Sequence, residues 1–305
     1  MENKEIQQIE SGEQIEELVV KSAEGQTEEQ STECVAPKTK IFPSFADVLM
    51  MVALFFVANL AVGVVVALMN ISATPLAHLL IYGSSMLLAL VLMTLYCIVR
   101  KQKPSPFRYK FHWYNSGLII WGLAAIGAVG IVEEPLLSLM PRSWLDSVNQ
   151  TIGTGVWAIC SLVVLAPIFE ELIFRGVILG SLRQRFGVLA SIVLSSLLFG
   201  VVHIVPQQAI NAALVGVILG GVYVATESMP AVIILHAINN GLSYLQYVTN
   251  PGGDGTMRGM LADDMSYRQV YIASCVFLIV SILLIVWLCR RNRSRKRVGE
   301  TVLSK

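Results

Sequence analysis

The chain has 305 residues, of which 55% are hydrophobic and only 14% are charged. Soluble domains carry about 25% charged residues, so this composition excludes an ordinary soluble protein and indicates a polytopic membrane protein. The formal net charge of +1 conceals a strong segregation of charge along the chain.

Residues 1–44 are predicted to form an acidic N-terminal tail. The segment is rich in Glu, Gln, Ser and Thr and has too few apolar side chains to build a core, so we expect it to be disordered. It lacks the basic start and apolar run of a signal peptide.

Eight apolar segments follow the tail. A membrane-spanning helix needs about 20 predominantly apolar residues. The segments with this character are residues 46–69, 75–99, 116–132, 151–182, 188–205, 209–225, 230–248 and 270–289. Glu133-Glu134-Pro135 is expected to end the third segment early, and residues 136–148 are expected to form an interfacial or re-entrant segment. The sequence therefore predicts an all-α bundle of about eight transmembrane helices over residues 45–289.

Basic residues cluster at 100–110, at 183–185 and at 290–297. With eight spans, these clusters lie on the same side as the N-terminus, and the excess of Lys and Arg predicts that this side is the cytoplasm. We expect a protein of the cell (inner) membrane with both termini cytoplasmic and a basic C-terminal tail over 290–305. Such a run anchors topology more often than it binds nucleic acid, so no nucleic-acid partner is predicted.

Two adjacent carboxylates and an arginine interrupt the fourth apolar segment. Each ionisable group at membrane depth costs about 2.5–3.5 kcal/mol by insertion scales, and such groups usually face the bundle interior. Glu171 and Arg175 are four residues apart and can pair on one helix face, which a purely structural ion pair would explain. Glu170 points about 100° away and has no partner in that arrangement, so it is the candidate for chemistry.

Two histidines and an asparagine lie in other segments. His203 is placed inside the fifth segment, and His236 and Asn240 are four residues apart on one helix face of the seventh. Glu170 and His203 each lie about 16 residues, or roughly 24 Å, from the turn expected between their segments. His236 matches that depth only if the helices bend, for which Pro167 offers a place.

Glutamate and histidine can position and deprotonate a water molecule, and histidine and asparagine can donate to an oxyanion. This set indicates peptide hydrolysis without a Ser or Cys nucleophile. Glu170, His203 and His236 could instead bind zinc, although the H-E-x-x-H helix is absent and asparagine is a poor zinc ligand. Transport, with Glu170 as a proton carrier, is a third interpretation.

Three motifs in three separate segments resemble those of the CPBP family, the CAAX proteases and bacteriocin-processing enzymes, also called the Abi family. The motifs are Glu170-Glu171-x-x-x-Arg175, Phe199-x-x-x-His203 and His236-x-x-x-Asn240. The resemblance covers roughly residues 151–248, and the family includes the type II CAAX prenyl endopeptidase.

The resemblance implies a glutamic-type intramembrane endopeptidase whose active site lies inside the bundle. Glu170 would be the general base, and His203 would help to hold the attacking water. His236 and Asn240 would stabilise the oxyanion, whereas the Glu171–Arg175 pair would support the site. Phe199 is expected to pack rather than react.

The same resemblance implies a peptide or protein substrate, with prenylated and membrane-embedded substrates as candidates, and a surrounding of membrane lipid. No cofactor is expected, and zinc stays open as an alternative. The competing interpretation is a non-proteolytic family member that acts as a membrane scaffold, a sensor regulator or a bacteriocin self-immunity protein.

Overall fold

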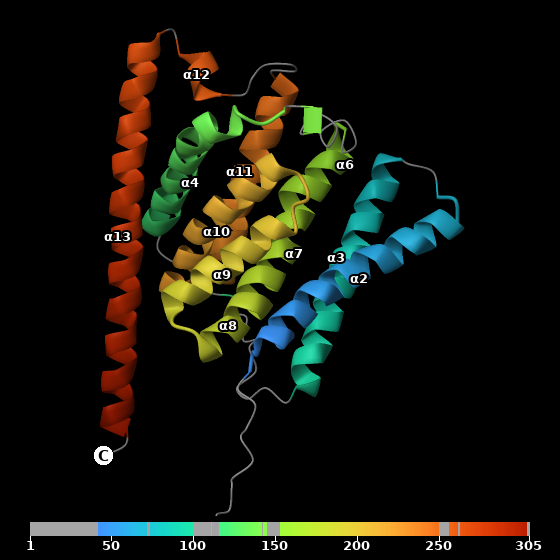
Figure 1. Cartoon of the computed structure of the whole chain (residues 1–305), viewed down its shortest axis with the longest axis horizontal. Coiled ribbons are helices and arrows are strands. Elements are labelled where there is room, and N and C mark those ends of the chain that lie inside the picture. Colours follow the sequence, from blue (N-terminus) through green and yellow to red (C-terminus); the bar gives the residue numbers. More distant parts are fainter. Residues whose placement is uncertain are drawn as a thin grey trace, which may run out of the picture. The chain divides into compact units, whose positions relative to one another are not determined.

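The computed structural model describes residues 42–71, 74–100, 111, 116–141, 143–144, 153–249, 256–261 and 263–303. All regular elements in these ranges are helices (Figure 1), which confirms the predicted all-α fold. The predicted disorder of the N-terminal tail concerns residues that lie almost entirely outside the described ranges.

The helices are α2 (Phe45–Leu68), α3 (Pro75–Val99), α4 (Ser116–Leu137), α6 (Val156–Ile159), η1 (Cys160–Leu165), α7 (Ala166–Glu171), η2 (Leu172–Leu179), α8 (Gly180–Arg185), α9 (Val188–Val201), α10 (Pro206–Thr226), α11 (Met229–Thr249), α12 (Met257–Met260) and α13 (Asp264–Leu303). The elements from α6 to α8 form one continuous segment, Val156–Arg185, in which η1 and η2 have the wider π-helical turn. This segment, α2, α3, α4, α10 and α13 are each long and apolar enough to cross a membrane. The shorter α9 and the more polar α11 complete the eight predicted segments.

Large apolar side chains cover the outside of the helices. Leu60 and Leu68 on α2 are 68% and 81% exposed, and Leu283 on α13 is 63% exposed. Soluble monomers rarely expose apolar surface on this scale, whereas lipid chains would cover it. Together with the spanning helices, these faces define a multi-pass membrane protein.

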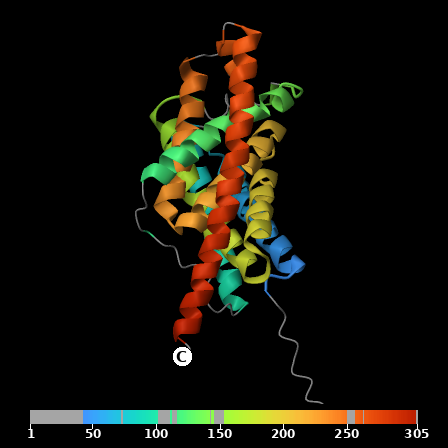
Figure 2. The ribbon, with the colours of Figure 1, turned by 90° about the vertical axis from the view of Figure 1, so that its left-hand side faces the viewer.

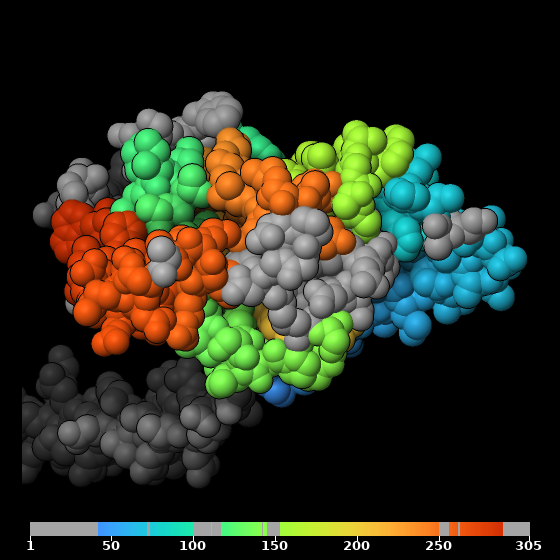
Figure 3. Space-filling model, turned by 90° about the horizontal axis from the view of Figure 1, so that it is seen from above, coloured from blue at the N-terminus to red at the C-terminus, as the bar shows by residue number. Residues whose placement is uncertain are grey.

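The α2–α3 hairpin and α13 lie at opposite sides of the bundle (Figures 1 and 3). α13 packs against α4 and α10, and α2 packs mainly against α3. The ends of α3 and α13 and the α8–α9 turn lie at one end of the bundle (Figures 1 and 2). Residues 101–110 of the first predicted basic cluster lie outside the described ranges, so the predicted sidedness of the basic segments stays a prediction.

The prediction that α4 ends before Glu133-Glu134-Pro135 is wrong, because the helix continues to Leu137. Each carboxylate has one oxygen that accepts a hydrogen bond, whereas its Oε2 is buried without a partner among the described residues. Asn211 on α10 donates to Glu133 Oε1 at 2.6 Å, and the Met257 backbone N–H donates to Glu134. The predicted interfacial segment 136–148 is described only in part, and its first residues belong to α4.

The placement of His203 inside a spanning helix is also wrong. α9 ends at Val201, and His203 lies in the turn before α10. Pro206 begins α10, and the residue that precedes a proline is disfavoured in helical conformation. Val205 accordingly has an extended backbone, with ψ at 120°, so the chain leaves the helix before it reaches Pro206. At the other end of the chain, α13 extends beyond the predicted span 270–289 in both directions.

Candidate active site

The two glutamates lie on α7, between the π-helical turns η1 and η2. Such wide turns are frequent at functional sites. Pro167 has no backbone N–H, so the carbonyl of Leu162, five residues earlier, loses the partner that a π-helical turn would supply. Asn240 Nδ2 on α11 donates to this carbonyl at 3.0 Å. The distortion that Pro167 introduces is therefore compensated by a neighbouring helix.

Glu171 and Arg175 form the ion pair that their spacing predicts. Arg175 Nη1 donates to Glu171 Oε1 at 2.8 Å, and the two side chains are 0–1% exposed. Arg175 Nη2 donates to the carbonyl of Gly216 on α10 at 3.2 Å, and the guanidinium lies 4.8 Å from the centre of the Phe199 ring. The pair thus joins the α6–α8 segment to α9 and α10.

His236 on α11 connects the two glutamates. Its Nδ1 lies 2.8 Å from Glu171 Oε1, and its Nε2 lies 3.7 Å from Glu170 Oε2. A hydrogen bond from Nδ1 to the Glu171 carboxylate fixes the ring so that Nε2 faces Glu170. The structure therefore brings the third motif to the depth of the first.

Glu170 faces a cavity and not the buried ion pair. The Tyr82 hydroxyl donates to Glu170 Oε1 at 2.8 Å. The cavity has a volume of about 270 Å³, and its polar lining consists of Tyr82, Glu170, His203 and Gln208. Apolar side chains from α2, α3, η2 and the α9–α10 turn form the remaining walls. Glu170 and His203, which lie on different elements, thus line one space.

His203 is oriented by its own chain. Its Nδ1 lies 2.8 Å from the Phe199 carbonyl. Because a carbonyl only accepts, Nδ1 donates, and in the neutral form of the ring Nε2 is then the acceptor. The Phe199 ring packs edge-on against His203 and His236, at centroid distances of 4.9 and 5.7 Å. Phe199 is buried, and its contacts are those of a packing residue.

Asn240 follows His236 by one helical turn but does not line the cavity that Glu170 and His203 share. Besides the bond from Nδ2 to Leu162, its Oδ1 accepts from Asn239 Nδ2 at 3.2 Å. An asparagine amide has two N–H donors. One donates to Leu162, and the second has no acceptor among the described residues.

Sequence reasoning missed Tyr82, because α3 contains no motif of the candidate site. A signal was present in Tyr82-Gly83-Ser84-Ser85, a polar interruption of an otherwise apolar helix. Its partner Glu170 is 88 residues away in the chain, and only the packing of α3 against α7 joins the two.

In the part of the chain that the structure describes, no three His, Cys, Asp or Glu side chains are gathered as a metal site requires. A catalytic zinc needs three protein ligands around one point. Glu170, His203 and His236, as they are placed, do not fit such a centre.

Taken together, these contacts define a membrane helix bundle with a buried carboxylate–histidine site. Residues 151–242 match the model of one protein family, which is described as type II CAAX prenyl endopeptidase Rce1-like. The matched region contains all three motifs, and the match confirms the resemblance of this part of the chain to that family, which is consistent with the CPBP family. No curated protein and no solved structure matches the chain.

Proposed function

We propose that the protein is an intramembrane endopeptidase of the CAAX-protease type, in which Glu170 activates a water molecule. The observation that carries the proposal is the cavity that Glu170 and His203 share. Glu171 Oε1 is held by Arg175 and His236, and Glu171 does not line the cavity. Glu170 does line it, and its Oε2 accepts no hydrogen bond among the described residues and is directed toward His236 Nε2. A carboxylate with one oxygen held and one available suits a general base.

In the proposed reaction, Glu170 takes a proton from water while His203 Nε2 accepts the second hydrogen bond of that water. The water oxygen then bonds to the carbonyl carbon of the substrate, and the electron pair of the C=O bond moves to the oxygen. When the tetrahedral intermediate collapses, the C–N bond breaks and the leaving amine takes the proton from Glu170. The two products are a carboxylic acid and an amine, and water and Glu170 supply every atom and proton that the step needs.

The oxyanion would be stabilised by His236 and Asn240. Because His236 Nδ1 donates to Glu171, its Nε2 can donate to an oxyanion only when the ring carries two protons. The second N–H of Asn240 supplies a neutral donor. A role for His236 in this step therefore depends on the protonation of its ring.

The apolar walls of the cavity favour a substrate with apolar side chains near the scissile bond. We propose a peptide or protein substrate presented from the membrane, with C-terminally prenylated segments as the first candidates, and a cell (inner) membrane location with cytoplasmic termini.

A specific observation also favours a second candidate, a non-proteolytic scaffold or regulator. Every printed hydrogen bond of Glu171, Arg175, His236 and Asn240 goes to another protein group, as it would in a purely structural network. In that case the loss of His203 would leave the function unchanged.

Cleavage by the purified, detergent-solubilised protein separates the candidates. Fluorogenic peptides with and without a farnesylated cysteine near the C-terminus are the probes. His203→Ala should lose cleavage, whereas His78→Ala, at the start of α3, should retain it. Absence of cleavage of every peptide by the wild type, or full activity of His203→Ala, would contradict the proposal. Loss of cleavage with a chelator and recovery with zinc would contradict the metal-free mechanism.

A further inference from the structure

We propose that Tyr82 is the positioning residue for Glu170, so that α3 completes a site whose motifs all lie on other helices. The inference rests on the proposed function and adds a residue outside the matched family region 151–242. Tyr82 orients the Glu170 carboxylate with one oxygen toward α3 and the other toward His236 and the cavity.

The contact geometry supports this role directly. Among the described residues, the Tyr82 hydroxyl is the only hydrogen-bond donor to Glu170, at 2.8 Å from Oε1. The other oxygen, Oε2, lies 3.7 Å from His236 Nε2, which is too long for a direct hydrogen bond. The phenol therefore occupies one oxygen and leaves the second for a water molecule.

The physical need for such a residue follows from the freedom of the glutamate side chain. A glutamate has several rotatable bonds, and holding it in one rotamer costs conformational entropy. A general base must lie within hydrogen-bond reach of the proton that it removes, and small misplacements reduce rates strongly. Tyrosine suits the task because its rigid ring carries a donor that stays neutral.

The packing of α3 brings Tyr82 to this position. α3 contacts α6, α7 and both π-helical turns. A Cβ atom at the neighbouring Gly83 would lie 2.9 Å from Leu165 Cδ2, so the glycine permits a close approach of α3 to η1. Met86, one turn after Tyr82, lines the same cavity.

A matched pair of variants on one helix tests the assignment. Tyr82 and Tyr96 both lie on α3, and each donates its hydroxyl to a carboxylate, but Tyr96 binds Asp47 away from the cavity. Tyr82→Phe should reduce kcat for the farnesylated peptide by about 10- to 100-fold with KM nearly unchanged. Tyr96→Phe should keep both constants near wild-type values. Equal kcat for Tyr82→Phe and the wild type, or equal losses in both variants, would overturn the inference.

A second measurement does not require cleavage. Dicyclohexylcarbodiimide modifies protonated carboxyl groups in apolar surroundings, and tandem mass spectrometry separates Glu170 from Glu171 in one peptide. Without the Tyr82 hydroxyl the ionised carboxylate loses a donor, so Tyr82→Phe should raise Glu170 labelling about fivefold, the equivalent of one hydrogen bond. Tyr96→Phe should not change it.

The two readouts separate the two proposals. Unchanged Glu170 labelling in Tyr82→Phe would overturn the positioning role even if the wild type cleaves peptides. Raised labelling in a protein that cleaves none of the peptides would support the positioning of Glu170 by Tyr82 and count against the proteolytic function alone.

Discussion

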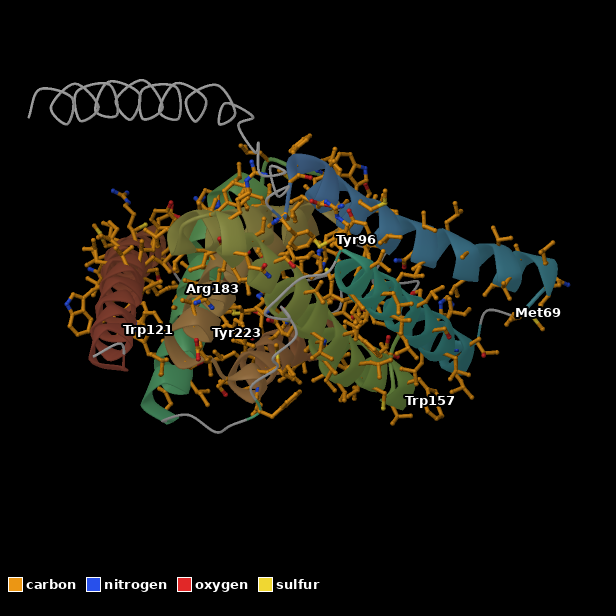
Figure 4. All side chains as sticks on the ribbon, turned by 90° about the horizontal axis from the view of Figure 1, so that it is seen from below. Met69, Tyr96, Trp121, Trp157, Arg183 and Tyr223 are labelled. Carbon is orange, nitrogen blue, oxygen red and sulfur yellow. The ribbon has the colours of Figure 1, made fainter. Side chains whose placement is uncertain are left out.

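Two regions of the molecule combine a carboxylate, an arginine and a tyrosine, and they differ in depth. At the ends of α2 and α3, Asp47 Oδ1 accepts from Tyr96 at 2.5 Å and from Arg100 Nε at 2.9 Å. Tyr96 is labelled in Figure 4. The Arg100 side chain is 35% exposed, whereas Arg175 and Glu171 in the bundle interior are almost fully buried.

The regions also differ in how completely their carboxylates are engaged. Asp47 Oδ2 accepts from the backbone and hydroxyl of Ser44 and from Arg100 Nη2, so both of its oxygens are occupied. Glu170 has only one oxygen occupied, by Tyr82. The same side-chain types thus close a helix end in one place and leave a carboxylate oxygen without a hydrogen-bond donor in the other. An unoccupied oxygen that faces a cavity is what distinguishes the candidate site from a structural cluster.

The largest effect that separates the regions is expected from the carboxylates themselves. Glu170→Gln keeps the size of the side chain and an acceptor for Tyr82 but removes the base, so peptide cleavage should fall by about 10³-fold. Asp47→Asn should leave kcat unchanged. Cleavage rates of the detergent-purified variants measure this difference, and matching melting temperatures show that both variants are folded. An active Glu170→Gln would mean that Glu170 and Asp47 do not differ in their importance for cleavage.

The next largest effect is expected on stability, from the loss of the buried Arg175. Arg175→Met leaves the Glu171 carboxylate without its cationic partner in a dry interior, which should cost about 3–5 kcal/mol of unfolding free energy. Equilibrium unfolding in mixed detergent micelles measures this cost. A loss below about 1 kcal/mol would show that His236 alone satisfies Glu171.

A smaller loss of unfolding free energy is expected when a side chain is added where α9 packs closely against α10. A Cβ at Gly200 on α9 would lie 2.6 Å from the Ala209 carbonyl oxygen of α10, whereas a Cβ at Gly63 on lipid-facing α2 would meet nothing within 4 Å. Gly200→Ala should therefore destabilise the protein by about 1–3 kcal/mol. Gly63→Ala is the control and should be neutral or slightly stabilising. Similar unfolding curves for both variants would contradict the tight contact between α9 and α10.

The smallest effect is expected at the membrane edge. Arg100→Met removes a partly exposed ion pair, which solvent screens, so the loss should be about 0–1 kcal/mol and should shrink further at high salt. Melting temperatures at low and high salt test this expectation. A loss as large as that of Arg175→Met would mean that the outer cluster is not the weaker of the two.

The sequence predicted what depends on neighbours along one helix. α3 begins at Pro75 as predicted, because Thr74 and Pro75 are strong helix-start residues, and the Glu171–Arg175 pair follows from its spacing. It did not predict contacts that arise only from packing between helices. The bond from His236 to Glu171 spans 65 residues, and the bond from Tyr82 to Glu170 spans 88.

Local chemistry explains the remaining differences. His203 was placed in a helix because the residues around it are apolar, but Pro206 ends that helix earlier. Asn240 was expected to serve the oxyanion, and its contact with Leu162 became visible only once the wide turn before Pro167 was known. The roles of Glu170, His203, His236 and Asn240 in a reaction stay predictions.

The most direct test of a glutamate-activated water is one turnover in H₂¹⁸O with enzyme in excess over peptide. If water attacks the carbonyl carbon, the new C-terminal carboxylate of the product carries one ¹⁸O atom and Glu170 carries none. If Glu170 itself attacks and water then hydrolyses the resulting anhydride at the glutamyl carbon, the first product carries only ¹⁶O and the label appears in the Glu170 carboxylate. Mass spectrometry of both fragments should find the first pattern, and the second would contradict the account.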